Sequence, residues 1–147
     1  MSEFLLRAAK AGDAQAIRDL IHRVNINPFS LDWRRFILAV DNSDSLVGCG
    51  QLKPHGRSLI ELASIAVQPE HQGQGIATAI IDRLLERAPR PLYLTCRGSM
   101  RPFYQKWGFQ ALRRSEMPPY FQRLERLAVV AGRLFGDDEG MLVMRLQ

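Results

Sequence analysis

Residues 72–77 (Gln-Gly-Gln-Gly-Ile-Ala) have the residue types of an anion-binding loop. Gly73 and Gly75 let a ligand come close to the backbone, and a helical pattern begins directly after them. The first N–H groups of a helix have no partner within the helix, and together with the helix dipole they favour a negative group such as a pyrophosphate. A plain turn from a strand into a helix explains the two glycines equally well.

Two well-known phosphate motifs do not fit this loop. A nucleotide P-loop ends in Gly-Lys-Ser/Thr, and residues 72–77 contain no lysine. A dinucleotide-binding Gly-x-Gly-x-x-Gly loop needs a third glycine at the position of Thr78. The phosphate ligand that we expect is therefore held by neither of these motifs.

The elements that position the loop are predicted from hydrophobic periodicity and turn residues. Residues 36–40, 46–52 and 59–67 are three strands with short links, which predicts an antiparallel meander, although 33–40 begins with a helical pattern. Residues 59–96 form a β-loop-α-β unit whose last strand, 92–96, is expected to run parallel to the first. The other predicted strands are residues 4–8, 109–112 and 141–146. One predicted helix follows a cap at Asp13, and another, 100–107, follows a cap at Ser99. The remaining predicted helices are residues 75–88 and 118–135.

Length and composition favour one ordinary globular domain over residues 1–147. Hydrophobic residues make up 46% and charged residues 24% of the chain, and no internal repeat is visible. Residues 118–135 form an extra amphipathic helix before the last strand, and it can pack on the core, form a homodimer face or cover the acceptor site. The sequence has neither a leader pattern nor a membrane-length apolar run, so we expect a cytoplasmic protein with no membrane partner.

The charged and metal-binding residue types narrow the ligands that we expect. A net charge of +5 favours an anionic ligand, but no nucleic-acid-binding motif accompanies it, so no nucleic-acid partner is expected. The three histidines are scattered and none pairs with a cysteine, so no metal is expected. Cys49 and Cys96 lie in apolar runs and are predicted to be buried free thiols.

Three motifs resemble the GNAT superfamily of N-acetyltransferases. Residues 65–77, Ile-Ala-Val-Gln-Pro-Glu-His-Gln-Gly-Gln-Gly-Ile-Ala, are similar to its acetyl-CoA signature of a strand, a turn and Arg/Gln-x-x-Gly-x-Gly/Ala. Residues 6–13 resemble its first strand and helix, and residues 103–109, Phe-Tyr-Gln-Lys-Trp-Gly-Phe, resemble its Phe-Tyr-x-x-x-Gly-Phe. Together the motifs cover most of residues 4–112.

The resemblance implies an α+β (α/β mixed) acyl-CoA N-acyltransferase fold, with a mixed antiparallel and parallel sheet flanked by helices. The sheet would be splayed at its fourth and fifth strands, with acetyl-CoA in the gap. The backbone of residues 65–67 would pair with the pantetheine arm, and the N–H groups of residues 72–78 would hold the pyrophosphate. The implied cofactor-binding residues are Ile65, Ala66, Val67, Gln72, Gly73, Gln74, Gly75, Ile76, Ala77, Thr78, Ser99 and Tyr104.

Acetyl transfer to an amine also needs a base and an acid. Strand alternation places Glu61 on one face with Ala63, Ile65 and Val67, and Glu61 matches the position of the base in many family members. Tyr104 matches the tyrosine that protonates the leaving CoA sulfur in the family. Alternatively, Glu61 is a carboxylate that is exposed to solvent or paired with an arginine. Tyr104 is alternatively an aromatic residue that only packs in the core.

The sequence therefore predicts an enzyme that transfers acetyl from acetyl-CoA to a primary amine by direct attack in a ternary complex. Glu61 acts through water as the base and Tyr104 acts as the acid. The acceptor is expected to be a small-molecule or peptide amine. A non-catalytic acyl-CoA sensor on the same fold is the main alternative.

Overall fold

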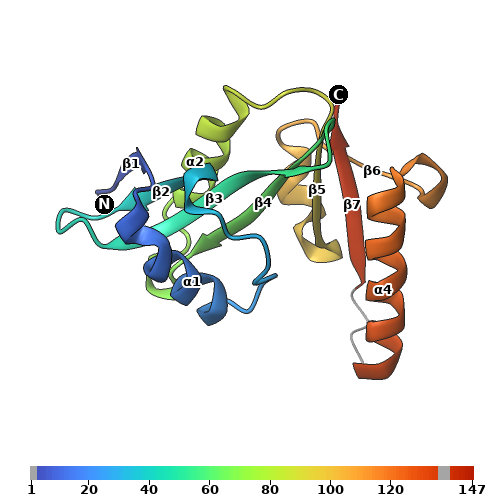
Figure 1. Cartoon of the computed structure of the whole chain (residues 1–147), viewed down its shortest axis with the longest axis horizontal. Helices are drawn as coiled ribbons and strands as arrows, with labels where there is room; N and C mark the ends of the chain where they lie inside the picture. Colours follow the sequence, from blue (N-terminus) through green and yellow to red (C-terminus); the bar gives the residue numbers. More distant parts are fainter. Residues whose placement is uncertain (1–2, 136–139) are drawn as a thin grey trace. The chain divides into compact units, whose positions relative to one another are not determined.

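The computed structural model describes residues 3–135 and 140–147. Figure 1 shows the strands and helices of this part of the chain. Their order is β1 (Leu5–Ala8), α1 (Ala14–Arg23), β2 (Phe36–Val40), β3 (Leu46–His55), β4 (Leu59–Val67), α2 (Ile76–Leu85), β5 (Leu92–Arg97), α3 (Arg101–Gln105), β6 (Gln110–Ala111), α4 (Pro119–Phe135) and β7 (Met141–Leu146).

The strands form one mixed sheet in the order β1-β2-β3-β4-β5-β7-β6. β1 with β2, β2 with β3, β5 with β7 and β6 with β7 are antiparallel pairs. β4 pairs with β5 in parallel, with Glu61 opposite Tyr93, as the β-loop-α-β unit predicts. β5 pairs with β7 along its whole length, from Leu92 to Arg97. The predicted fold class, a mixed sheet flanked by helices, is confirmed.

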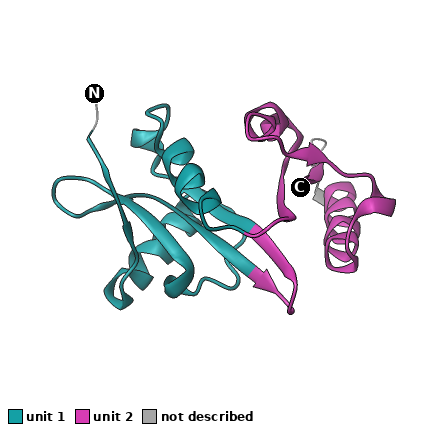
Figure 2. Ribbon diagram, turned by 90° about the horizontal axis from the view of Figure 1, so that it is seen from above, with its two compact units in different colours: residues 1–53, 62–88 teal, residues 54–61, 89–147 magenta. Residues whose placement is uncertain are grey.

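Contacts between Cα atoms divide the chain into two compact units, which Figure 2 colours separately. Unit 1 comprises Met1–Lys53 and Leu62–Ala88, and unit 2 comprises Pro54–Glu61 and Pro89–Gln147. The boundary crosses β3 and β4, so that the hairpin tip between them belongs to unit 2. The single domain over residues 1–147 stays a prediction.

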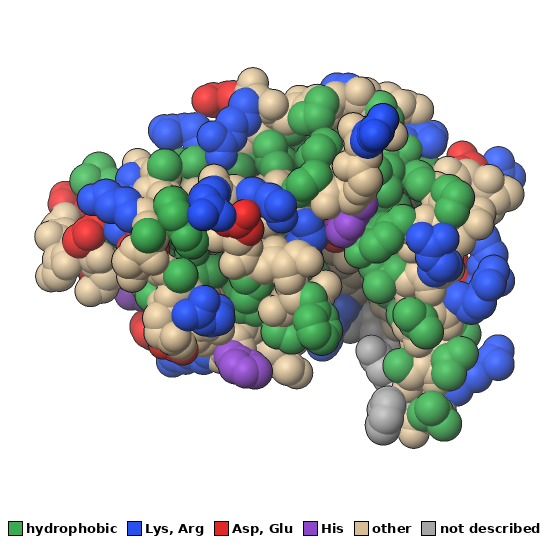
Figure 3. Space-filling view, viewed as in Figure 1, with side chains coloured by type: hydrophobic (Ala, Val, Ile, Leu, Met, Phe, Trp, Pro, Cys, Tyr) green, Lys and Arg blue, Asp and Glu red, His purple; other side chains and the backbone are tan. Residues whose placement is uncertain are grey.

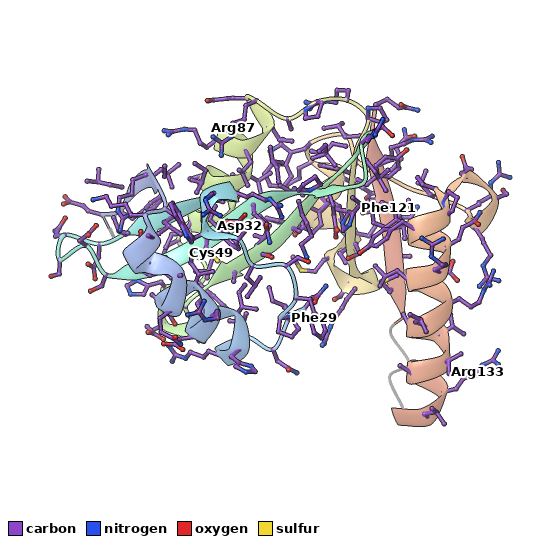
Figure 4. All side chains as sticks on the ribbon, in the orientation of Figure 1. Phe29, Asp32, Cys49, Arg87, Phe121 and Arg133 are labelled. Carbon is purple, nitrogen blue, oxygen red and sulfur yellow. The ribbon has the colours of Figure 1, made fainter. Side chains whose placement is uncertain are left out.

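The core of unit 1 lies under α1, whose apolar residues recur at helical spacing. Ile17, Leu20 and Ile21 are buried and pack on Phe36, Leu38, Val40, Cys49 and Ala66. Figure 4 labels Cys49. Burial raises the pKa of this thiol to about 12, so Cys49 is the neutral buried thiol that the sequence predicts. Cys96 is also free but only half-buried.

Two glycines of β3 allow α2 to approach the sheet closely. A Cβ at Gly48 would lie 2.7 Å from Cγ2 of Ile76, and one at Gly50 would lie 2.8 Å from Cγ2 of Ile80. These distances are shorter than van der Waals contact, so a larger residue would push the helix away from β3. The helix that begins after the glycine loop is thereby packed directly on the strand.

The core of unit 2 lies between α4 and the strands β5 and β7. Tyr93, Met117, Phe121 and Val143 form this cluster. Phe121 is fully buried, and its ring centroid is 5.3 Å from that of Tyr93. In Figure 4 the Phe121 side chain points from α4 toward the strands, whereas Arg133 points away from the helix. Core packing is thus confirmed for the first turn of the helix predicted at 118–135.

Several predicted boundaries and the predicted caps need correction. Asp13 is the N-cap residue of α1, as predicted, but its side chain makes no capping hydrogen bond. Its carboxylate instead accepts hydrogen bonds from the Lys10 backbone N–H at 2.7 Å and from Arg7 at 2.8 Å. Ser99 lies inside a 3-10 turn, Gly98–Met100, that precedes the shorter helix α3. A 3-10 turn at Trp33–Arg35 followed by β2 resolves the ambiguity at 33–40. β6 is shorter than predicted, because Phe109 is buried beside Tyr104 rather than paired in the sheet.

Candidate active site

The loop between β4 and α2 has two glycines with left-handed backbones. The φ angles of Gly73 and Gly75 are 80° and 81°, and a Cβ at either would meet no atom within 4 Å. From the sequence, glycine was expected at these positions so that a ligand can come close to the backbone. The structure gives a second reason for glycine, because residues with a Cβ rarely adopt these φ angles. The space next to both glycines is open.

The start of α2 has free hydrogen-bond donors behind these glycines. Gly75 is the N-cap and has no side chain that could cap the helix. The N–H of Ala79 donates to the Gly75 carbonyl at 3.0 Å, so the N–H groups of residues 76–78 precede the first helical hydrogen bond. Open space and free donors at a helix start fit an anionic group such as a pyrophosphate.

Polar side chains hold the segment before the glycines. The Gln72 side-chain amide donates to the Val67 carbonyl at 3.2 Å, which ties the loop to the end of β4. Glu70 pairs with Arg23 of α1 at 2.9 Å, and this guanidinium holds the pKa of Glu70 below its ordinary value. Glu70 therefore forms an ion pair with α1, which favours a structural role over a catalytic one.

The strand β4 departs from regular alternation at Ser64. This residue has a φ of 59°, and Glu61, Leu62 and Ala63 are all buried in succession. Because this angle interrupts the strand, regular alternation does not place Glu61 and Ile65 on one face. The prediction that the two residues share a face is therefore wrong. Nothing local in the sequence signals this, since serine is not a residue that favours a left-handed backbone.

The distortion at Ser64 is held by side chains of β3. The Gln51 amide donates to Ser64 Oγ at 2.8 Å and to the Ser30 carbonyl at 3.2 Å, and Cys49 Sγ donates to the Ser64 carbonyl at 3.4 Å. Gln51 is fully buried. Ser30 also has a left-handed φ of 58°, so one amide stabilises two unusual backbones. The backbone of residues 65–67 follows directly after this fixed point.

Glu61 lies in unit 2 and is buried, with 7% of its surface exposed. Its Oε1 is 2.6 Å from Nε2 of His55. Within residues 3–135 and 140–147 no arginine pairs with this carboxylate, so neither alternative interpretation, a solvent-exposed carboxylate or an arginine pair, describes Glu61. His55 is a functional candidate that the sequence analysis missed. The two residues are six positions apart across the β3–β4 turn, and this hairpin is the signal that could have paired them.

The helix α4 adds an aromatic residue to this pair. The Tyr120 ring stacks on the His55 ring with centroids 3.9 Å apart, and Phe121 meets the same imidazole edge-on at 6.1 Å. Burial, and then the charge of Glu61, raises the pKa of Tyr120. One face of the imidazole is therefore covered by an aromatic ring from α4.

Tyr104 is the buried tyrosine of α3, with 8% of its surface exposed. Burial, and then Cys96, raises its pKa to about 12, so the phenol keeps its proton near neutral pH, as a general acid must. Its ring also packs against Phe103 at 5.1 Å and Phe109 at 6.2 Å. A role of Tyr104 in core packing is thus compatible with a role as general acid. Ser99 is exposed in the turn before α3.

The described residues, 3–135 and 140–147, contain neither a cluster of metal-binding side chains nor a helix that could span a membrane. Within these ranges no three His, Cys, Asp or Glu side chains are grouped so that they could hold a metal ion. None of the helices in this part of the chain has the length and apolar character needed to span a membrane.

A model of the Acetyltransferase (GNAT) family matches residues 6–109. The chain therefore belongs to the GNAT family of acetyltransferases, and the resemblance inferred from the three motifs is confirmed. No match was found among curated proteins.

Solved structures of low sequence identity have the same fold. Rv2747 from Mycobacterium tuberculosis, in complex with CoA, is 24% identical with a TM-score of 0.72, and the match covers 97% of this chain and 98% of that one. N-acetylglutamate synthase from Neisseria gonorrhoeae, complexed with coenzyme A and N-acetyl-glutamate, is 20% identical with a TM-score of 0.72. That match covers 100% of this chain and 36% of the other, so this chain spans about a third of the length of that enzyme. Escherichia coli ElaA matches over the full length of both chains at 16% identity and a TM-score of 0.66.

Proposed function

We propose that the protein is an acetyl-CoA-dependent N-acetyltransferase that acts on a primary amine. Membership of the GNAT family and the CoA-bound structures of the same fold support this reaction class. The observation that carries the proposal is the start of α2, where Gly73 and Gly75 leave open space in front of uncapped helical donors.

In this proposal the N–H groups of residues 72–78 hold the pyrophosphate, and the backbone of residues 65–67 pairs with the pantetheine arm. The left-handed Ser64, which is hydrogen-bonded to Gln51 and Cys49, directly precedes these residues in β4. Acetyl-CoA, when bound, supplies the acetyl group as an activated thioester. Ser99 and Tyr104 are further cofactor-binding candidates from unit 2.

Glu61 is proposed as the base. An alkyl amine with a pKa of ~10.4 loses its proton at pH 7 at a cost of about 4–5 kcal/mol, so attack by its nitrogen needs a proton acceptor. Glu61 holds its carboxylate beside His55 and accepts the amine proton through a water molecule. Tyr104 donates its phenolic proton to the sulfur of the departing thiolate.

The acceptor is proposed to be a small-molecule or peptide amine. Because N-acetylglutamate synthase shares the fold and was crystallised with N-acetyl-glutamate, glutamate and other α-amino acids belong at the head of an acceptor panel. Polyamines, arylalkylamines and peptide N-termini complete that panel.

The test is to incubate the protein with acetyl-CoA and each amine and to measure released thiol and acetylated product by mass spectrometry. We expect one class of amine to give both in equal amounts. If acetyl-CoA binds but no amine in the panel gives product, the non-catalytic acyl-CoA sensor replaces the enzyme. If acetyl-CoA does not bind, both proposals are wrong.

A further inference from the structure

Glu61 is a buried charge in a protein that buries few. In the described part of the chain, the buried polar or charged residues are Gln51, Lys53 and Glu61. An ionised carboxylate is costly to bury unless it is paired and hydrogen-bonded. The partner of Glu61 is the imidazole of His55, whose Nε2 lies 2.6 Å from Oε1.

We propose that His55 is a positioning residue that sets the base strength of Glu61, so that the pair rather than the carboxylate alone decides the pH range of acetyl transfer. This inference rests on the proposed function, in which Glu61 is the base. When neutral, His55 donates its Nε2–H to Oε1 of Glu61 and leaves Oε2 to accept the amine proton. When protonated, the imidazolium neutralises the carboxylate and makes it a weaker base.

The geometry gives His55 one orientation. The Tyr120 ring covers a face of the imidazole with centroids 3.9 Å apart, and Phe121 bounds its edge. Side chains of His55 and Glu61 are 15% and 9% exposed, so the hydrogen bond is largely shielded from water. A shielded hydrogen bond transmits a change of charge on one partner to the other more strongly than an exposed one does.

The other titratable groups around the pair come from three elements, α4, β5 and β7. Tyr120 of α4 faces the pair, and because its pKa is raised it stays uncharged in the working range. Tyr93 of β5 lies opposite Glu61 in the sheet, and Arg145 of β7 pairs with Tyr93 in turn. His55 is therefore the ionisable side chain that is hydrogen-bonded to Glu61.

Removal of the imidazole leaves a buried carboxylate without its donor. Desolvation then favours the protonated acid, which is not a base. For His55→Ala we expect the acid limb of the kcat/KM profile to move upward by about one pH unit or more. On the acid limb, activity then falls by up to about 10-fold for each pH unit of the shift, and it recovers toward the wild-type value at higher pH. His55→Gln keeps an N–H donor at similar reach, and we expect it to restore most of the activity at low pH.

The experiment measures kcat/KM from pH 5.5 to 9 for the wild type, His55→Ala, His55→Gln, Glu61→Gln and His22→Ala with one amine. The protonation of the amine contributes equally to every profile, so differences report on the protein. His22→Ala removes an exposed histidine of α1 and serves as the matched control, with a profile like that of the wild type. Melting temperature and acetyl-CoA affinity establish that each variant is folded.

Each proposal is contradicted by a different result. A wild type without acetyl transfer overturns the proposed function itself, and full activity of Glu61→Gln overturns only Glu61 as the base. If Glu61→Gln is inactive but folded His55→Ala loses activity equally at every pH, or loses none, the proposal for His55 is overturned. If His55→Ala fails to fold, the pH profile of His55→Gln tests the proposal for His55. Loss of activity at low pH in His55→Gln would contradict it, because the glutamine amide is expected to replace the imidazole N–H as donor.

Discussion

At the scale of single residues, the structure combines packing and chemistry in the same side chains. Tyr104 is buried among aromatic rings and yet keeps a polar hydroxyl, and Glu61 is buried and yet paired with a histidine. Apolar residues of the same shape would satisfy the packing at lower cost in desolvation. The proposed roles as acid and base account for the polar atoms of these two side chains.

Tyr104→Phe tests the acid. Because the ring is kept, we expect the same melting temperature and acetyl-CoA affinity, with kcat reduced about 100-fold. The phenol has a pKa of about 12, so the loss should be equal from pH 6 to 9. Unchanged kcat in steady-state assays over this range would remove Tyr104 from the mechanism.

Gly75→Glu tests the phosphate loop. A side chain at φ 81° costs about 1–3 kcal/mol of strain, and the carboxylate also repels phosphate at the helix start. We expect acetyl-CoA to bind at least about 10-fold more weakly than to Gly75→Ala, which carries the strain without the charge.

Gly140→Glu is the matched control for this variant. Gly140 also has a left-handed φ, 74°, and open space where a Cβ would lie, but it lies before β7. Calorimetric titration of Gly140→Glu with acetyl-CoA should give the wild-type affinity. Normal affinity of Gly75→Glu would overturn the assignment of the loop.

At the scale of elements, α4 has two faces with different roles. Its buried face contributes Phe121 to the core of unit 2 and Tyr120 to the His55 stack. Figure 3 shows hydrophobic side chains exposed along the same helix, and Leu127, Val130 and Leu134 are 68%, 50% and 73% exposed. The amphipathic pattern in the sequence identified the helix, but its apolar positions are not all directed to the core.

Two substitutions in α4 separate these faces. Phe121→Ala removes a fully buried ring and is expected to lower the free energy of unfolding by about 3–5 kcal/mol. Leu127→Ala removes an exposed side chain and is expected to change it by less than about 0.5 kcal/mol. Urea unfolding followed by circular dichroism gives both values. A similar loss in both variants would show that the exposed face is also packed in solution.

At the scale of the whole molecule, net charge bears on cofactor capture. The chain has 20 Lys and Arg against 15 Asp and Glu, a net charge of +5, and acetyl-CoA is an anion. Long-range attraction between them is screened as ionic strength rises. We expect the KM for acetyl-CoA to increase several-fold between about 0.05 and 0.5 M salt, with little change in the KM of an uncharged acceptor amine. A KM for acetyl-CoA that is independent of salt would contradict this prediction.

The sequence by itself determined the family, the order of the elements and the position of the glycine loop between β4 and α2. These features depend on local rules, since glycines permit left-handed angles at 73 and 75 and apolar spacing distinguishes helices from strands. Only the tertiary structure decided the partner of Glu61, the stacking of Tyr120 on His55 and the break in alternation at Ser64. The stacking of Tyr120 on His55 joins segments far apart in the chain, and the break at Ser64 is a backbone angle that the residue type does not specify. His55 and Glu61 are only six positions apart, and their contact depends on how the β3–β4 hairpin brings them together. Glu61 was therefore identifiable from the sequence as a candidate base, whereas its environment required the fold.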